Sequence, residues 1–213
     1  GVYLMHIPDG ILTPEAVVVG YAVTGATLAL ALRKINARPD PEADLPKAAL
    51  LTAAFFVASW IHIPIPPTSV HLILNGLLGV LLGWYAVPAI IVGLFLQAIM
   101  FQHGGLTSLG VNAAMMTWPA LLAYGIFSLR GHSHRVIKLK KHHATAILAF
   151  TGGAVGLGVA AFVAFSILIL TIPSYFDVAA ERAAITALTI AHVPLALIEG
   201  AFTVSIVSFI LRV

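Results

Sequence analysis

Long apolar stretches recur along this chain, separated by short polar, glycine-rich or proline-rich interruptions. A helix needs about 20 mostly apolar residues to cross the hydrocarbon core of a bilayer. The pattern therefore predicts an all-α membrane protein, a seven-span helical bundle in a single transmembrane domain, residues 1–213. The expected spans are 12–35, 46–62, 69–84, 88–102, 112–129, 144–171 and an apolar segment that ends near 211, after a short amphipathic stretch.

Local signals mark several of these boundaries. Thr13 can cap the first helix, and Pro14 suits its first position, where an amide donor is not needed. The sequence Ile63-Pro64-Ile65-Pro66-Pro67 is expected to end the second span, because proline cannot continue a helix. Glycines at 152–158 in the sixth span permit close helix packing.

The basic residues predict the orientation of the bundle. Residues 36–46 and 130–143 are expected to be loops, and with their flanking residues and Arg212 they hold ten of the eleven Lys and Arg side chains. All ten fall on one side of the seven-span topology, and only Arg182 falls on the other. Cytoplasmic loops carry the excess of Lys and Arg. We therefore expect an external N-terminus, cytoplasmic loops at 36–46 and 130–143, and a cytoplasmic C-terminus.

The composition supports a membrane protein and excludes other classes. The chain is 60% hydrophobic and 9% charged, with a mean hydropathy of +1.03, whereas a soluble domain carries about 25% charged residues. The pI near 9.4 reflects the basic loops, so no nucleic-acid partner is expected. The absence of cysteine excludes disulfides and thiolate ligands.

Histidine is the unusual residue here, with nine copies against eight carboxylates, and it is the commonest metal ligand. The topology sorts the histidines into an external group and a cytoplasmic group. The external group comprises His6, His62, His71, His103 and His192, and the cytoplasmic group comprises His132, His134, His142 and His143.

The N-terminal segment, residues 1–11, is the candidate metal-binding segment. A square-planar Ni(II) or Cu(II) site needs four in-plane donors, and nitrogen suits it. If the functional chain begins at Met5, its amine, the His6 amide and the His6 imidazole can fill three positions. We expect His71 to complete the plane, and Asp9 to orient an imidazole from behind. Further supporting groups are expected at His62, Asn75, His103, Asn112, His192 and Glu199.

Plainer interpretations stay open for each of these residues. His6 fits an ordinary surface position in a short tail, and His62 and His103 fit interfacial hydrogen-bonding positions. His192 fits a residue that holds helices together, and Glu199 fits a structural hydrogen-bond acceptor. Two rival function classes are an intramembrane metalloenzyme and a structural or accessory membrane protein.

Four ordered motifs resemble the CbiM/NikM family, the substrate-binding (S) components of energy-coupling-factor transporters for cobalt and nickel. The first is Met5-His6-Ile7-Pro8-Asp9-Gly10, and the second runs from Ile63-Pro64-Ile65-Pro66 through Ser69-Val70-His71-Leu72 to Asn75-Gly76-Leu77-Leu78-Gly79. The third is residues 102–112, Gln-His-Gly-Gly-Leu-Thr-Ser-Leu-Gly-Val-Asn, and the fourth is His192-Val193-Pro194 with Glu199-Gly200. The Ile-Pro-Asp-Gly form is similar to the nickel branch.

The resemblance implies a helical bundle into which the Met-His end inserts. It implies that Ni(II), or Co(II), is the transported substrate and is held by the Met5 nitrogen, the His6 backbone and ring nitrogens, and His71. The implied location is a prokaryotic cell membrane. The implied partners are an energy-coupling transmembrane subunit, two ABC-type ATPase subunits that hydrolyse ATP, and often a small accessory membrane protein. The chain itself is then not an enzyme.

The residues before Met5 generate a first prediction. In the resembled family Met-His forms the mature N-terminus, whereas here Gly1–Leu4 precede it and make the Met5 nitrogen a peptide amide. We expect the chain that starts at Gly1 to bind nickel weakly or not at all, and the chain that starts at Met5 to bind it. Calorimetric titration of both chains measures this, and equal affinities would contradict it.

Overall fold

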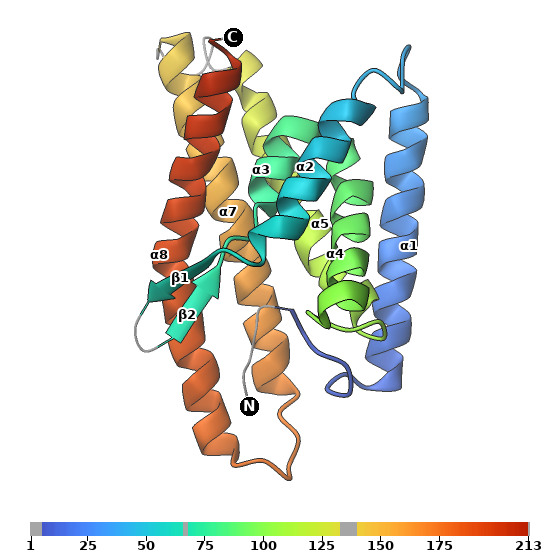
Figure 1. The fold of residues 1–213 in the computed structure, drawn as a ribbon, viewed down its shortest axis with the longest axis vertical. Helices are drawn as coiled ribbons and strands as arrows, with labels where there is room; N and C mark the ends of the chain where they lie inside the picture. Colours follow the sequence, from blue (N-terminus) through green and yellow to red (C-terminus); the bar gives the residue numbers. More distant parts are fainter. Residues whose placement is uncertain (1–5, 66–67, 133–139, 213) are drawn as a thin grey trace.

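The computed structural model describes residues 6–65, 68–132 and 140–212. Most of these residues are helical, with one small antiparallel hairpin between the second and third helices (Figure 1). The elements in chain order are α1 (Pro14–Asn36), α2 (Leu45–Ala58), β1 (His62–Ile65), β2 (Thr68–His71), α3 (Asn75–Leu82), the 3₁₀ helix η1 (Gly83–Tyr85), α4 (Ala86–Phe101), α5 (Leu109–Ser128), the 3₁₀ helix η2 (Leu129–Gly131), α7 (Lys141–Leu170) and α8 (Val178–Ile210).

Five helical segments of the described residues are long and apolar enough to cross a membrane. They are Pro14–Asn36, Asn75–Phe101, Leu109–Gly131, Lys141–Leu170 and Val178–Ile210, and α2 is a shorter apolar helix. The chain is therefore a multi-pass membrane protein. In the bundle α5 packs against α1, α3 and α7, and α7 packs against α8. The core lies where α3, α4, α5 and α7 meet.

The hairpin corrects the predicted third span. Residues Thr68–His71 form strand β2, which pairs with β1 in the register His62↔His71 and Pro64↔Ser69. The helix begins only at Asn75, and its eight residues extend about 12 Å, too short to cross a bilayer alone. The all-α expectation is thus wrong for this segment. A proline can lie in a strand of a two-stranded sheet, where its missing amide breaks no central ladder.

Other boundaries shift because helices extend into the expected loops. Helix α2 already includes Leu45 and Pro46, and α7 begins at Lys141, so both basic loops are shorter than predicted. Helix α8 runs without interruption through Pro194 for 33 residues. Its start is stabilised by Asp177, whose carboxylate accepts hydrogen bonds from the backbone amides of residues 179 and 180.

Several local predictions are confirmed. The Thr13 hydroxyl accepts a hydrogen bond from the Ala16 amide at 3.3 Å, and Pro14 opens α1. The glycines of α7 permit the expected close packing, since a Cβ on Gly156 would lie 2.5 Å from the Gly76 Cα of α3. The ends of α1 and η2 and the start of α7, which carry basic residues, all lie at the upper end of the bundle in Figure 1, where α8 also ends.

Candidate metal centre

The N-terminal segment enters the bundle as irregular chain and is held there by α5. The Asn112 side chain accepts a hydrogen bond from the Ile7 amide at 2.9 Å and donates one to the Ile7 carbonyl at 3.0 Å. The Ser108 hydroxyl donates to the same carbonyl at 2.6 Å. Ile7 is fully buried and His6 is 2% exposed. The Asn112 side chain thus supplies the donor and the acceptor that a paired β-strand would give to Ile7. This contact places the His6 ring inside the protein.

Asp9 joins the same segment to the loop that precedes α5. Its carboxylate accepts hydrogen bonds from the backbone amides of Leu106, Thr107 and Ser108 and from the Thr107 hydroxyl. A Cβ on Gly105 would lie 2.0 Å from this carboxylate, so only glycine fits there. Desolvation raises the pKa of Asp9, but these hydrogen bonds outweigh it and lower the pKa below its ordinary value. Asp9 therefore anchors a loop, whereas the sequence predicted that it orients an imidazole.

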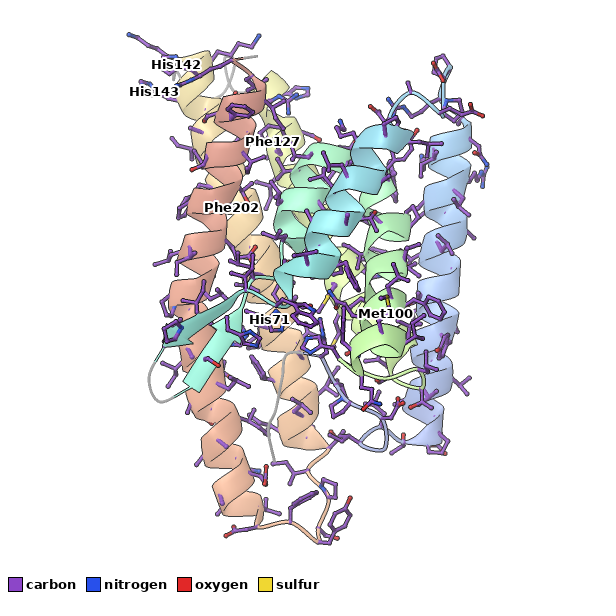
Figure 2. The ribbon with its side chains drawn as sticks, viewed as in Figure 1. His71, Met100, Phe127, His142, His143 and Phe202 are labelled. Carbon is purple, nitrogen blue, oxygen red and sulfur yellow. The ribbon has the colours of Figure 1, made fainter. Side chains whose placement is uncertain are left out.

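His71 comes from the end of strand β2, and its position depends on Glu199 of α8. The Glu199 carboxylate accepts hydrogen bonds from the amides of Ile73 at 2.5 Å and Leu74 at 3.0 Å. Leu74 has a φ of 65°, a left-handed conformation that costs energy for a residue with a side chain. The fully buried carboxylate stabilises this turn, and it fixes the backbone two residues beyond His71. Figure 2 shows His71 inside the bundle, away from the end that carries His142 and His143.

Three imidazoles converge at this point from three separate parts of the chain. The His71 and His103 Nε2 atoms lie 3.2 Å apart, and the ring centres of His6 and His103 lie 4.3 Å apart. One ring nitrogen from each of His6, His71 and His103 lies within 4.8 Å of the others. Nitrogen ligands sit about 2 Å from a metal ion, hence about 3–4 Å from one another. A small inward movement of these rings would make a metal site.

The protonation state of the rings also suits a metal. Both ring nitrogens of His6 are buried without a hydrogen-bond partner, which is unusual for buried polar atoms. Desolvation by burial lowers the pKa of His6 well below its ordinary value and lowers the pKa of His71 to about 4, and the neighbouring histidines add to both shifts. Burial lowers the pKa of His103 as well. The cluster is therefore neutral near pH 7, as a metal ligand must be.

His71 has a fixed tautomer. Its Nδ1 lies 3.0 Å from the Leu72 carbonyl, which can only accept a hydrogen bond, so Nδ1 carries the proton. The Nε2 lone pair then points toward the cluster, where it faces His103. An imidazole whose other nitrogen is held by a carbonyl is the usual arrangement for a metal ligand.

The remaining predicted residues lie around this cluster. The His62 ring centre is 6.2 Å from that of His71, on the exposed side. His192 hydrogen-bonds the Leu188 carbonyl at 2.8 Å and packs against Phe165, a helix-stabilising role. Asn75 donates to the carbonyls of residues 116 and 156, which ties α3 to α5 and α7. Met5 lies outside the described residues.

Sequence reasoning ranked His103 only as a supporting residue, yet its ring lies inside the cluster. The motif Gln102-His103-Gly104-Gly105 was the available signal, because Gln102 and Gly104 both adopt positive φ and turn the chain back toward the bundle. The position of this motif in the fold depends on the hydrogen bond between Asp9 and the Leu106 amide, two residues 97 positions apart in the sequence.

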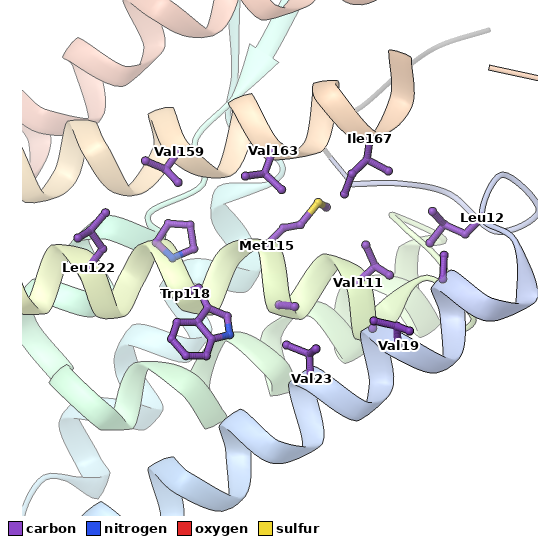
Figure 3. Close-up of a pocket in the computed structure, with 14 residues that line it drawn as sticks. Leu12, Val19, Val23, Val111, Met115, Trp118, Leu122, Val159, Val163 and Ile167 are labelled. Carbon is purple, nitrogen blue, oxygen red and sulfur yellow. The ribbon is translucent and has the colours of Figure 1, made fainter. Parts of the chain in front are cut away.

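A second concavity in the bundle differs in chemistry. It has a volume of about 650 Å³ and lies between α1, α5 and α7. Figure 3 shows apolar side chains around it, among them Val23, Val111, Met115, Trp118 and Val163. Such a lining offers one thioether and no imidazole or carboxylate, so it lacks the donors that Ni(II) or Co(II) needs. The histidine cluster is therefore the candidate site among the described residues.

The fold and the cluster define a class: a multi-pass helical membrane protein with a buried group of imidazoles inside its bundle. Comparison with known proteins gives the family. The profile described as "Cobalt uptake substrate-specific transmembrane region" (CbiM) matches residues 6–213. The chain therefore belongs to the CbiM family, and it is a membrane component of cobalt or nickel uptake.

Individual relatives agree with this assignment. The cobalt transport protein CbiM of Clostridium tetani is 30% identical over 224 residues, which cover 99% of this chain and 86% of that protein. The fused nickel transport protein NikMN of Rhodobacter capsulatus is 42% identical over 114 residues, 53% of this chain and 33% of that longer protein. A crystal structure of a truncated transition metal transporter matches with a TM-score of 0.77 at 29% identity, over 97% of this chain and 98% of that chain.

Asn112→Ala tests how the N-terminal segment is held. The substitution leaves the buried Ile7 amide without its acceptor, and we expect it to destabilise the protein by about 1–3 kcal/mol. Hydrogen exchange at the Ile7 amide should accelerate far more than exchange in α7. Mass spectrometry of exchanged peptides and thermal unfolding in detergent measure the two effects.

Ser108→Ala is the matched control, because it removes only one of the two donors to the Ile7 carbonyl and should have a smaller effect. An Asn112→Ala protein that protects Ile7 as well as the wild type would show that the segment is held by other contacts.

Proposed function

We propose that this protein captures Ni(II), or alternatively Co(II), on the external side of a prokaryotic cell membrane and delivers it for ATP-driven uptake. The cluster of His6, His71 and His103 is the observation that supports this most. A buried imidazole without hydrogen-bond partners is costly for stability, and metal binding would use the unpaired nitrogens of His6. The nickel branch is favoured by the Ile7-Pro8-Asp9-Gly10 sequence.

The proposed ligands are four nitrogens in a square plane: the Met5 nitrogen, the His6 backbone and ring nitrogens, and the His71 ring. The unpartnered His6 ring and the inward-facing lone pair of His71 Nε2 support this set. His103 would hold the His71 ring in place until the metal arrives, since their Nε2 atoms are 3.2 Å apart. Asn112 and Asp9 would position the segment that carries His6.

The bundle would sit with its basic end in the cytoplasm. Lys and Arg accumulate on the cytoplasmic side of membrane proteins. Helix α1 begins at the opposite end and α8 ends among the basic residues, so the N-terminus would be external and the C-terminus cytoplasmic (Figure 1). The expected seven crossings would then require α2 and α3 to act as short spans. The metal would reach the cluster from the hairpin side.

Transport would require partners: an energy-coupling transmembrane subunit, two ABC-type ATPase subunits and a small accessory membrane protein. Small residues on α1 support a membrane-embedded contact, since Ala22, Gly25, Ala26 and Ala29 are all exposed. Exposed small residues let another helix approach closely. ATP would be hydrolysed by the partner subunits, because this chain has no phosphate-binding Gly-Lys-Ser/Thr motif.

The absorption spectrum of the nickel-loaded protein tests this proposal against an intramembrane metalloenzyme. A filled plane of four nitrogens should give a square-planar d–d band in the visible blue, whereas a catalytic metal keeps an open position and would give an octahedral signature with labile waters. His71→Ala should lower nickel affinity by at least about 100-fold.

His142→Ala, at the other end of the bundle, is the control and should leave the spectrum and the affinity unchanged. If His6→Ala and His71→Ala both bound nickel as well as the wild type, the cluster would have only a structural role.

The pH dependence of binding separates ring ligands from backbone ligands. The pKa of His71 is lowered to about 4 and that of His6 is lowered well below 6.5, so neither ring gains a proton between pH 8 and pH 6. Imidazoles alone would then give a constant nickel affinity in this window. Displacement of a proton from the His6 amide or the Met5 amine should instead lower the affinity about tenfold per pH unit as the pH falls. Calorimetry at several pH values measures the slope, and a flat profile would contradict backbone ligation.

A further inference from the structure

We propose that His62 is a transient capture ligand that receives a divalent metal ion at the open face of the hairpin and passes it to His71. This inference rests on the proposed function of the buried cluster, and it concerns the route to that cluster. It assigns to an exposed histidine a kinetic role that is separate from the resting metal site.

His62, His71 and His6 form a series of decreasing exposure. His62 is exposed and His103 is partly buried, whereas His71 is 4% and His6 2% exposed. Successive ring centres are close, 6.2 Å from His62 to His71 and 5.5 Å from His71 to His6. The partly buried His103 lies beside both inner rings, 4.9 Å from His71 and 4.3 Å from His6. The series leads from the surface into the centre of the bundle with no gap longer than its first step.

The hairpin register places the first two members face to face. His62 of β1 is the Cα partner of His71 of β2. Directly opposed residues on antiparallel strands project to the same side of a sheet. An ion about 2 Å from a ring nitrogen lies roughly 3 Å from the ring centre, so two rings that share one ion have centres up to about 6 Å apart. The spacing of His62 and His71 fits the passage of a single ion between them.

The two rings also have the same tautomer. The His62 Nδ1 lies 3.1 Å from the Trp60 carbonyl, and the His71 Nδ1 lies 3.0 Å from the Leu72 carbonyl. A carbonyl accepts only, so both Nδ1 atoms carry the proton and both Nε2 atoms keep a lone pair for a metal. Backbone carbonyls next to the hairpin strands thus fix both rings in the tautomer that a metal ligand needs, before any ion arrives.

A relay of this kind changes rates and leaves the equilibrium unchanged. Binding to His62 would make the next ligand exchange intramolecular, with an effective concentration of His71 in the millimolar range. The ion could exchange its bound waters for nitrogen ligands one at a time, because it would still be hydrated at His62 and would lose its last waters only at His6. The same contact would speed release, so the resting affinity would not depend on it.

Stopped-flow mixing of the full chain with nickel chloride in detergent tests the inference, with the Gly1 or the Met5 form chosen for its tighter nickel binding. We expect His62→Ala to lower both the association and the dissociation rate constant about tenfold. The calorimetric affinity and the final absorption spectrum should remain those of the wild type. His62→Gln, which keeps a polar side chain of similar size, should behave in the same way.

His142→Ala is the matched control, an exposed histidine at the opposite end, and it should leave both rates unchanged. Unchanged rates in the His62→Ala and His62→Gln proteins would overturn the relay while the proposed function stands. A weaker affinity with an altered spectrum would also overturn it, because His62 would then belong to the resting site. A wild-type chain that binds no nickel would overturn the proposed function itself.

Discussion

The pairing of the Asn112 side chain with the Ile7 backbone is the interaction on which the metal centre depends. Irregular backbone is tolerated at membrane depth only where the protein satisfies its polar groups. The Asn112 amide is both donor and acceptor, so one side chain satisfies the amide and the carbonyl of Ile7 together. Without it, the buried Ile7 amide would have no acceptor, and the Ile7 carbonyl would keep only the Ser108 hydroxyl as a donor.

The same physical solution recurs at the two other irregular segments of the site. Glu199 binds the amides of Ile73 and Leu74 and so supports the left-handed turn between the hairpin and α3. Asp9 binds three consecutive amides of the loop before α5. Each acceptor belongs to one part of the chain and each amide group to another. The three histidines therefore come together through backbone anchoring, and both ring nitrogens of His6 remain without a hydrogen bond that would compete with a metal.

Much of the helical framework could be predicted from local sequence. Thr13 and Pro14 define the start of α1 through their own side chains, and the glycines of α7 remove the Cβ atoms that would separate it from α3. The low charge requires a membrane environment whatever the tertiary fold. His6 and His71 were recognisable as candidates because the motifs around them are similar to those of the CbiM/NikM family. These features depend on residues close together in the chain, or on composition alone.

The hairpin, the short helix α3 and the membership of His103 in the cluster were decided only by the tertiary structure. The sequence predicted one helix ending at 62, a proline break at 63–67 and a new helix from 69, because prolines mark the end of a helix without specifying the structure of the next segment. A two-stranded sheet is marginal by itself, and here it lies against α8. His103 meets His71 at the start of the loop whose amides Asp9 binds. The sequence alone determined the membrane class, the start of α1 and the candidate ligands, which depend on local chemistry, whereas contacts between residues about 100 positions apart decided which rings meet.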